Sequence, residues 1–76
     1  MRMAETVQQL RQEQGFSQAE FAQRGGITLD ALRNVETGGT ARPRTIERIA
    51  RALGLTPMEL YERAAALIDS EGVRAE

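Results

Sequence analysis

Apolar side chains recur every three or four positions along most of this chain, which is the spacing of one face of a helix. Near the start, Met3, Val7 and Leu10 form such a stripe, so we expect a helix over about residues 3–14. No segment alternates between apolar and polar residues as a half-buried strand does, and none repeats. The pattern predicts an all-α fold, a compact domain of five helices.

Residues 17–36 predict two short helices joined by a tight turn. Ser17 and Glu20 have the spacing of a capping box at the start of the first helix. A glycine pair at 25–26 ends that helix, and Thr28 can cap the next one. One buried face is supplied by Phe21, Ala22, Ile27, Leu32 and Val35. These features together predict a helix-turn-helix, a motif whose second helix enters the major groove of DNA.

Two further helices are expected after a flexible break at residues 37–40. Pro43 opens the first of them and Gly54 ends it, and its buried side consists of Ile46, Ile49, Ala50 and Leu53. Residues 56–59 (TPME) combine an N-cap, a proline in the first turn and a reciprocating glutamate. The last helix is apolar over more than one narrow stripe, through Met58, Leu60, Tyr61, Ala64, Leu67 and Ile68.

Length and composition fit one small domain without covalent or metal cross-links. The 76 residues include no cysteine and no histidine, so disulfides, the commonest metal ligand and the usual general base are all missing. We therefore expect no metal, no cofactor and no enzymatic activity. Residues 1–69 should form the domain, and residues 70–76 a flexible tail. Because no apolar run reaches about 20 residues and no signal-peptide core is present, we expect a cytoplasmic protein without membrane contact.

Charge is distributed unevenly along the chain. The net charge is −1 and lysine is absent, which counts against a nucleic-acid-binding domain because such domains are often basic. Residues 42–55, however, hold four arginines and one glutamate, whereas residues 56–76 hold five acidic residues and two arginines. This separation favours one surface for phosphate and another for a different contact. An ordinary mixed, solvated surface is the alternative.

Seven short motifs in register resemble the Cro/C1-type (XRE-like) helix-turn-helix family, which includes the DNA-binding domains of lambdoid phage repressors. The motifs are Leu10-Arg11, GFSQAE at 15–20, Ala22, GIT at 26–28, VETG at 35–38, RPR at 42–44 and IARALG at 49–54. The resemblance covers about residues 3–62 and implies a lambda-repressor-like fold. It also implies a homodimer that binds double-stranded operator DNA in the nucleoid and regulates nearby genes, as a repressor or an activator.

The resemblance assigns candidate DNA contacts to three parts of the chain. Gln18, at the start of the second helix, matches a glutamine that contacts phosphate in the family. The base-reading positions of the third helix match Thr28, Leu29, Asp30, Arg33 and Asn34. The loop that follows the DNA backbone matches residues 37–44, including Thr37, Arg42 and Arg44. Many lambdoid repressors have glutamines at the positions of Leu29 and Asp30, so the operator sequence of a relative does not transfer.

The chemistry of these side chains suits base edges and phosphates. Arg33 can form two hydrogen bonds with guanine, and Asn34 can do so with adenine. Leu29 can pack on a thymine methyl group, and Asp30 can accept a hydrogen bond from cytosine N4. The two arginines that flank Pro43 suit phosphate or the minor groove.

Each of these assignments has a structural alternative. Thr28 can serve mainly as a helix cap, and Asp30 can simply stabilise the start of its helix. Arg33 can pair with Asp30 or Glu36, each three residues away. Arg11 can reach a phosphate or pair with an acidic residue, and the sequence does not decide between these.

The apolar surface of the last helix suggests a contact between two copies of the chain. Leu60 is expected in the monomer core, whereas Tyr61, Ala64 and Ile68 are candidates for a two-fold interface. An alternative function uses the same surface: a protein-interaction module, such as an antitoxin-like chain, that binds a protein partner. The acidic balance and the missing lysines favour that alternative.

Overall fold

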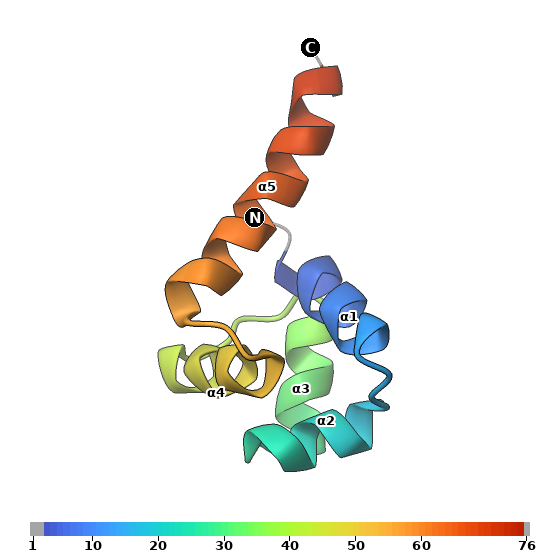
Figure 1. Ribbon diagram of the computed structural model, residues 1–76, viewed down its shortest axis with the longest axis vertical. Coiled ribbons are helices and arrows are strands. Elements are labelled where there is room, and N and C mark those ends of the chain that lie inside the picture. Colours follow the sequence, from blue (N-terminus) through green and yellow to red (C-terminus); the bar gives the residue numbers. More distant parts are fainter. Residues whose placement is uncertain (1–2, 76) are drawn as a thin grey trace.

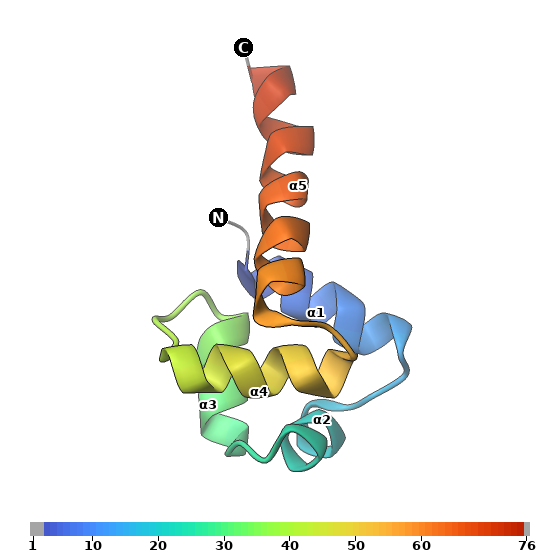
Figure 2. The same ribbon diagram turned by 60° about the vertical axis from the view of Figure 1, so that its left-hand side comes forward.

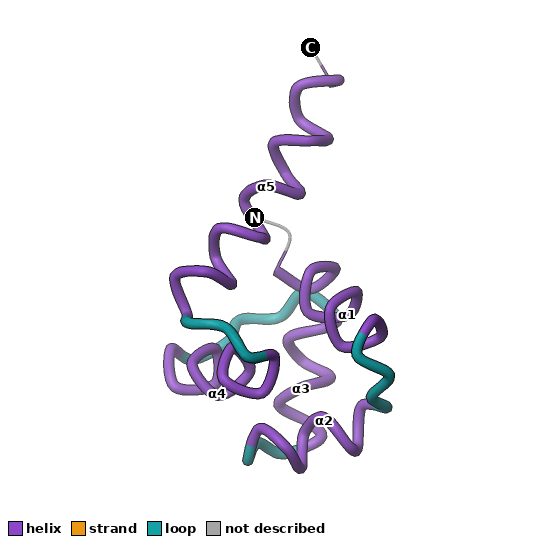
Figure 3. Tube along the Cα trace, in the orientation of Figure 1, coloured by secondary structure: helices purple, strands orange, loops and turns teal. Residues whose placement is uncertain are grey.

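A computed structural model of the protein describes residues 3–75, and the side chains of residues 3–66. The predicted all-α fold of five helices is confirmed, and the described residues form no strand. The helices are α1 (Met3–Glu13), α2 (Gln18–Gly25), α3 (Leu29–Glu36), α4 (Pro43–Leu53) and α5 (Pro57–Ala75). Short loops join them (Figure 3).

The helices pack so that α2 and the start of α3 form one end of the molecule. Helix α1 packs on α3, α4 and α5, and α2 packs on α3 and α4. Figures 1 and 2 show from two directions that α5 extends away from the end formed by α2 and the α2–α3 turn. A surface on the exposed part of α5 is therefore separate from one built around the start of α3.

The turn between α2 and α3 is fixed by capping interactions that the sequence predicts. Glu20 N–H donates to Ser17 Oγ at 3.1 Å, and Ser17 N–H donates to Glu20 Oε1 at 2.9 Å, which closes the capping box. Gly26 adopts a left-handed conformation with φ of 69°, which favours glycine because it has no Cβ. Thr28 Oγ1 then accepts from Ala31 N–H at 3.0 Å and caps α3.

The start of α5 is also capped as expected. Glu59 N–H donates to Thr56 Oγ1 at 3.1 Å, and Thr56 N–H donates to Glu59 Oε1 at 2.8 Å. The helix continues to Ala75, so residues 70–75 have a helical backbone where the sequence predicted a tail. The flexibility of that segment and the domain boundary at residue 69 stay predictions.

The core consists of apolar residues from all five helices, and most of them belong to the predicted stripes. Phe16 and Phe21 hold the start of α2 in place, because their ring centroids lie 6.2 Å apart across the N-cap. Ile27 is only half-buried but packs against the core. The buried apolar residues are Val7, Phe21, Ala22, Leu32, Val35, Ile46, Ile49, Ala50, Ala52, Leu53, Leu60 and Ala64.

Two sequence expectations can be examined within the described residues. None of the helices there is both long enough and apolar enough to cross a membrane. Nor do those residues bring together three or more His, Cys, Asp or Glu side chains in a group that could hold a metal ion.

The capping box of α2 should make part of the stability depend on pH. The backbone N–H of Ser17, and to a lesser degree its hydroxyl, hold the pKa of the Glu20 carboxyl below its ordinary value of 4.5. The folded state therefore binds this proton more weakly than the unfolded chain does. The contribution of the ionised Glu20 carboxylate to the free energy of unfolding is fully present above about pH 4.5 and is lost as the pH falls below that value.

Glu20→Gln removes this titration but keeps an oxygen that can accept from Ser17 N–H. We expect the unfolding free energies of wild type and Glu20→Gln, measured in urea, to converge as the pH falls below about 4.5. A difference that stays constant over that range would contradict the role assigned to the ionised carboxylate.

Candidate nucleic-acid interface

Helix α3 presents a polar face to solvent. Asp30, Arg33 and Asn34 are exposed, whereas Leu32, Val35 and Glu36 are buried. Leu29, the candidate for packing on a thymine methyl group, is half-buried. Side chains that could reach base edges are therefore aligned along one side of a short, capped helix.

A buried ion pair ties this helix to α1. Arg11 Nε donates to Glu36 Oε2 at 2.7 Å, and Arg11 Nη2 donates to Glu36 Oε1 at 3.1 Å. The two side chains are only 9% and 2% exposed. Arg11 Nη1 also donates to Phe16 O at 2.7 Å, which holds the loop between α1 and α2. Such a bidentate pair fixes the orientation of both side chains.

Gln18 connects the start of α2 to the same ion pair. Its Nε2 donates to Glu36 Oε1 at 2.9 Å, and the side chain is half-buried. A side-chain amide carries two N–H donors, so this contact orients the group and uses one of them. Gln18 also lies in the first turn of α2, where free backbone N–H groups and the helix dipole favour an anion. The arrangement suits a phosphate contact at this point.

The loop after α3 is held by two residues of the predicted site. Thr37 Oγ1 donates to Arg33 O at 2.9 Å and to Asn34 O at 3.1 Å, at the end of the helix. Asn34 Nδ2 donates to Thr40 O at 2.8 Å. A Cβ atom at Gly39 would overlap the Asn34 amide, so the loop passes close to this side chain. The Asn34 amide therefore braces the loop in this conformation. The same amide is the group that the sequence expects to read a base, and its Nδ2 is already bonded to Thr40 O.

Arg42 and Arg44 lie beyond the loop, and both are exposed. They line a hollow of about 300 Å³ together with Thr28 and Ala31 of the α3 start. We call it the groove-side hollow; its other lining residues are Gly26, Ile27, Thr45 and Arg48. The predicted loop arginines therefore lie beside the predicted recognition helix.

The structure decides between several of the alternatives. Thr28 is an N-cap, and Arg11 pairs with Glu36 over 25 positions of sequence. Because Glu36 is buried and bonded to Arg11 and Gln18, it is not the partner of Arg33. Among the described side chains, no ion pair joins Arg33 to Asp30 either. The Arg33 guanidinium therefore remains available at the surface.

The candidates for a two-fold interface have different positions. Tyr61 is 40% exposed, as such a role requires. Ala64 is fully buried inside the monomer, so its assignment to an interface surface was wrong: the residue faces the core of its own chain. Ile68 lies outside the side chains that the structure describes. Met58, which the sequence placed only among the apolar residues of α5, is 68% exposed three positions before Tyr61.

Sequence reasoning missed the role of Glu36 and of Arg48. Glu36 lies four positions after Leu32 on the buried stripe of α3, and Arg11 lies four positions after Val7 on that of α1. An acidic residue on one buried stripe and a basic residue on another could have indicated a buried ion pair between α1 and α3. Arg48 Nη1 donates to Gly26 O at 2.7 Å and so holds the α2–α3 turn. Nothing in the local sequence indicates that contact.

A comparison with known protein families agrees with this geometry. A family model described as helix-turn-helix matches residues 7–60, which include α2, α3 and the loop after them. The matched region thus contains the exposed α3 face and the arginines beside it.

Removing the acid of the buried pair should destabilise the fold strongly. Glu36→Gln leaves the Arg11 guanidinium buried without a counter-charge, so we expect unfolding free energy to fall by about 3–5 kcal/mol. Glu47→Gln, an exposed change of the same kind on α4, should alter it by less than about 0.5 kcal/mol.

A double variant separates the buried charge from lost packing. Arg11→Met combined with Glu36→Leu removes both charges, and it should cost less than Glu36→Gln alone in the same urea melts. An equal or greater loss in the double variant would show that an uncompensated charge is not the cause.

Proposed function

We propose that this chain, which belongs to the Cro/C1-type helix-turn-helix family of DNA-binding regulators, recognises a specific duplex sequence with α3 in the major groove. The observation that carries the proposal is the arrangement around α3. The start of α2 at Gln18, which suits a phosphate, lies on one side of the exposed face of α3. Two exposed arginines, Arg42 and Arg44, lie on the other side.

Base reading is assigned mainly to Arg33 and Asp30. Arg33 is exposed, has no acidic partner among the described residues, and has the donor geometry that guanine O6 and N7 accept. Asp30 lies three positions earlier on the exposed face, and its carboxylate can accept from cytosine N4. An acid so near phosphate also disfavours base pairs that offer no donor, which adds to specificity.

Backbone contact is assigned to the two ends of the site. Gln18 is oriented by Glu36, and Arg42 and Arg44 are placed by the loop that Asn34 braces. Thr28 acts as the cap of α3, and Thr37 closes its other end. In this scheme Asn34 affects every DNA sequence alike, because it shapes the loop instead of reading a base.

The active species is proposed to be a homodimer on a two-fold operator. Met58 and Tyr61 are the large apolar side chains exposed among the described residues, and both lie on α5. Figures 1 and 2 show that α5 begins on the side of α4 opposite α2, so a contact through its first turns leaves the start of α3 free. Half-sites should lie about 34–36 Å apart, one turn of DNA. Such a dimer would act on nucleoid DNA in the cytoplasm and regulate nearby genes, as a repressor or an activator.

The same exposed pair on α5 is the observation behind a second candidate function. Met58 and Tyr61 could dock a different protein, in which case the helical scaffold serves as an interaction module. The two functions differ in a simple measurement, because only the first requires DNA affinity that depends on sequence and on salt.

Fluorescence anisotropy with purified protein tests the proposal. A labelled fragment from upstream of the chain's own gene is titrated at two salt concentrations, with and without a scrambled competitor. Tight binding that resists the scrambled DNA supports a specific regulator. Binding that any DNA removes equally, or none even at low salt, would favour the interaction module.

Two neighbouring residues of α3 should respond differently in that assay. Arg33→Ala should cost about 1–3 kcal/mol on the preferred sequence and much less on a duplex changed at the base pair that Arg33 contacts. Asn34→Ala should weaken binding by a similar factor on both duplexes, because it releases the loop that places Arg42 and Arg44.

Arg63→Ala, an exposed arginine of α5, is the control for the loss of one positive charge. If Asn34→Ala instead lost affinity on one base pair only, Asn34 would be a base reader and the assignment of a bracing role would be wrong.

A further inference from the structure

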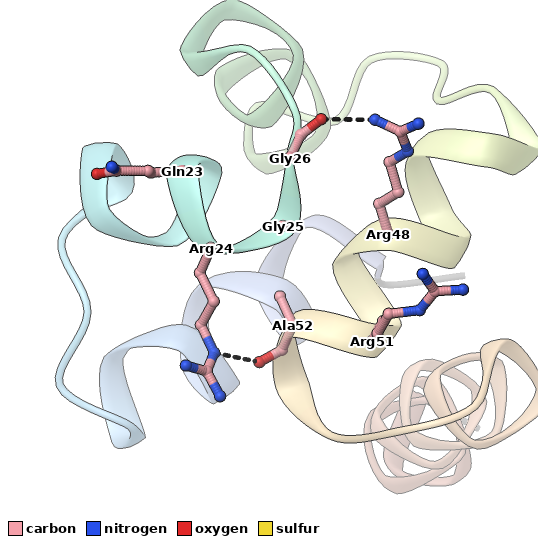
Figure 4. Close-up of a pocket in the computed structure, with 7 residues that line it drawn as sticks. All are labelled: Gln23, Arg24, Gly25, Gly26, Arg48, Arg51 and Ala52. Atoms are coloured by element: carbon pink, nitrogen blue, oxygen red, sulfur yellow. Dashed lines mark hydrogen bonds between the residues drawn. The ribbon is translucent and has the colours of Figure 1, made fainter.

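A second hollow lies on the side of the α2–α3 turn that faces α4. Its volume is about 510 Å³, and its lining includes Arg24, Gly25, Gly26, Arg48, Arg51 and Ala52 (Figure 4). We call it the arginine hollow. Three guanidinium groups line it, and no carboxylate does among the residues that the structure describes. The nearest acid in sequence, Glu47, is not part of the lining.

Two of the three arginines are held in place by backbone carbonyls. Arg24 Nε donates to Ala52 O at 3.1 Å, and Arg48 Nη1 donates to Gly26 O at 2.7 Å (Figure 4). A carbonyl bond orients a guanidinium but leaves its charge uncompensated, and each group has five N–H donors. The structure thus supplies two oriented cations whose remaining donors have no acidic partner within residues 3–66.

Arg51 completes the set and has no fixed partner among the described residues. It is exposed, and no hydrogen bond or ion pair holds it there. In Figure 4 the Arg24 guanidinium points away from those of Arg48 and Arg51, and it lies over the Phe16 ring at 5.2 Å from the ring centroid. An anion at the edge of the hollow beside α4 therefore gains favourable interactions mainly with Arg48 and Arg51. The glycine pair 25–26 adds no side chain to block an approaching group.

The arginine hollow adjoins the groove-side hollow. Gly26 and Arg48 line both. Arg44, Arg48 and Arg51 are spaced four and three positions apart, which puts them on one side of α4. A track of positive charge therefore leads from the start of α3, along α4, to the far side of the α2–α3 turn.

We propose that the arginine hollow binds a phosphate of the DNA backbone, beyond the segment that α3 reads. This inference rests on the proposed function. The ligand chemistry is a phosphate group, and the row of Arg44, Arg48 and Arg51 along α4 favours a phosphate of the bound duplex over one on a free small molecule. A duplex that follows the track makes more backbone contacts than the exposed face of α3 provides alone.

Arg51→Gln is the sharpest test, because it breaks no side-chain hydrogen bond or ion pair to any other residue that the structure describes. Binding to a long mixed-sequence duplex is measured by anisotropy at several salt concentrations. We expect the slope of log K against log salt to become shallower by about 0.9, the value for one lost phosphate contact. Arg51→Lys keeps the charge and should keep the slope. Arg63→Gln, the matched exposed change on α5, should leave it unchanged.

A second measurement distinguishes the two sources of phosphate. Inorganic pyrophosphate is titrated into the full chain without DNA, and the amide NMR signals of Gly25 and Gly26 are followed. If Arg51→Gln binds DNA with the wild-type slope, the proposal is overturned. Shifts of both signals at low pyrophosphate concentration would then identify the ligand as a free phosphate compound.

Failure of the proposed function gives a different result. In that case the wild-type protein itself shows no salt-dependent affinity for DNA, and the proposed binding of a DNA phosphate in the arginine hollow is wrong as well. A slope that differs between wild type and Arg51→Gln, but not between wild type and Arg63→Gln, supports the proposal.

Discussion

The buried pair of Arg11 and Glu36 is the interaction on which the arrangement of α1, α2 and α3 depends. Two charges removed from water are tolerated only when paired and hydrogen-bonded. Here the guanidinium also donates to Phe16 O, and the carboxylate also accepts from Gln18. No buried side-chain nitrogen or oxygen of the described residues is left without a partner. A different packing of α1 against α3 would leave one of these charges buried without its partner. The pair therefore strongly favours the observed packing of the two helices.

The exposed face of α3 follows from that constraint. Because Leu32, Val35 and Glu36 face inward, the 3.6-residue period of the helix turns Asp30 and Arg33 outward. The same carboxylate orients Gln18 at the start of α2, so the proposed base-reading and phosphate-contacting groups are aligned by one buried residue. The positive charge lies near the same face, because the arginines of α4 are beside the α2–α3 turn. The exposed apolar pair, Met58 and Tyr61, lies elsewhere, on α5.

Local signals in the sequence predicted the fold well, and long-range contacts limited the prediction of the site. Capping residues such as Ser17 and Thr28 act within one helical turn, so their roles could be inferred from neighbouring residues alone. The partner of Arg11 is 25 positions away and depends on how two helices cross. Asn34 fits a base reader by residue type, but the path of the loop engages its amide. The burial of Ala64 could not be predicted, because apolar residues occur on more than one side of α5. The sequence pattern therefore does not show which side of this helix faces the core.

Sequence-specific recognition by α3 can be measured by selection from a random duplex library. Wild-type protein is used to enrich bound duplexes over several rounds at moderate salt, and the enriched pool is sequenced. If a dimer reads DNA with α3, the pool should contain a single short motif repeated with two-fold symmetry, with half-site centres about 34–36 Å apart. A pool that binds without any enriched motif, or no bound pool at all, would contradict such recognition.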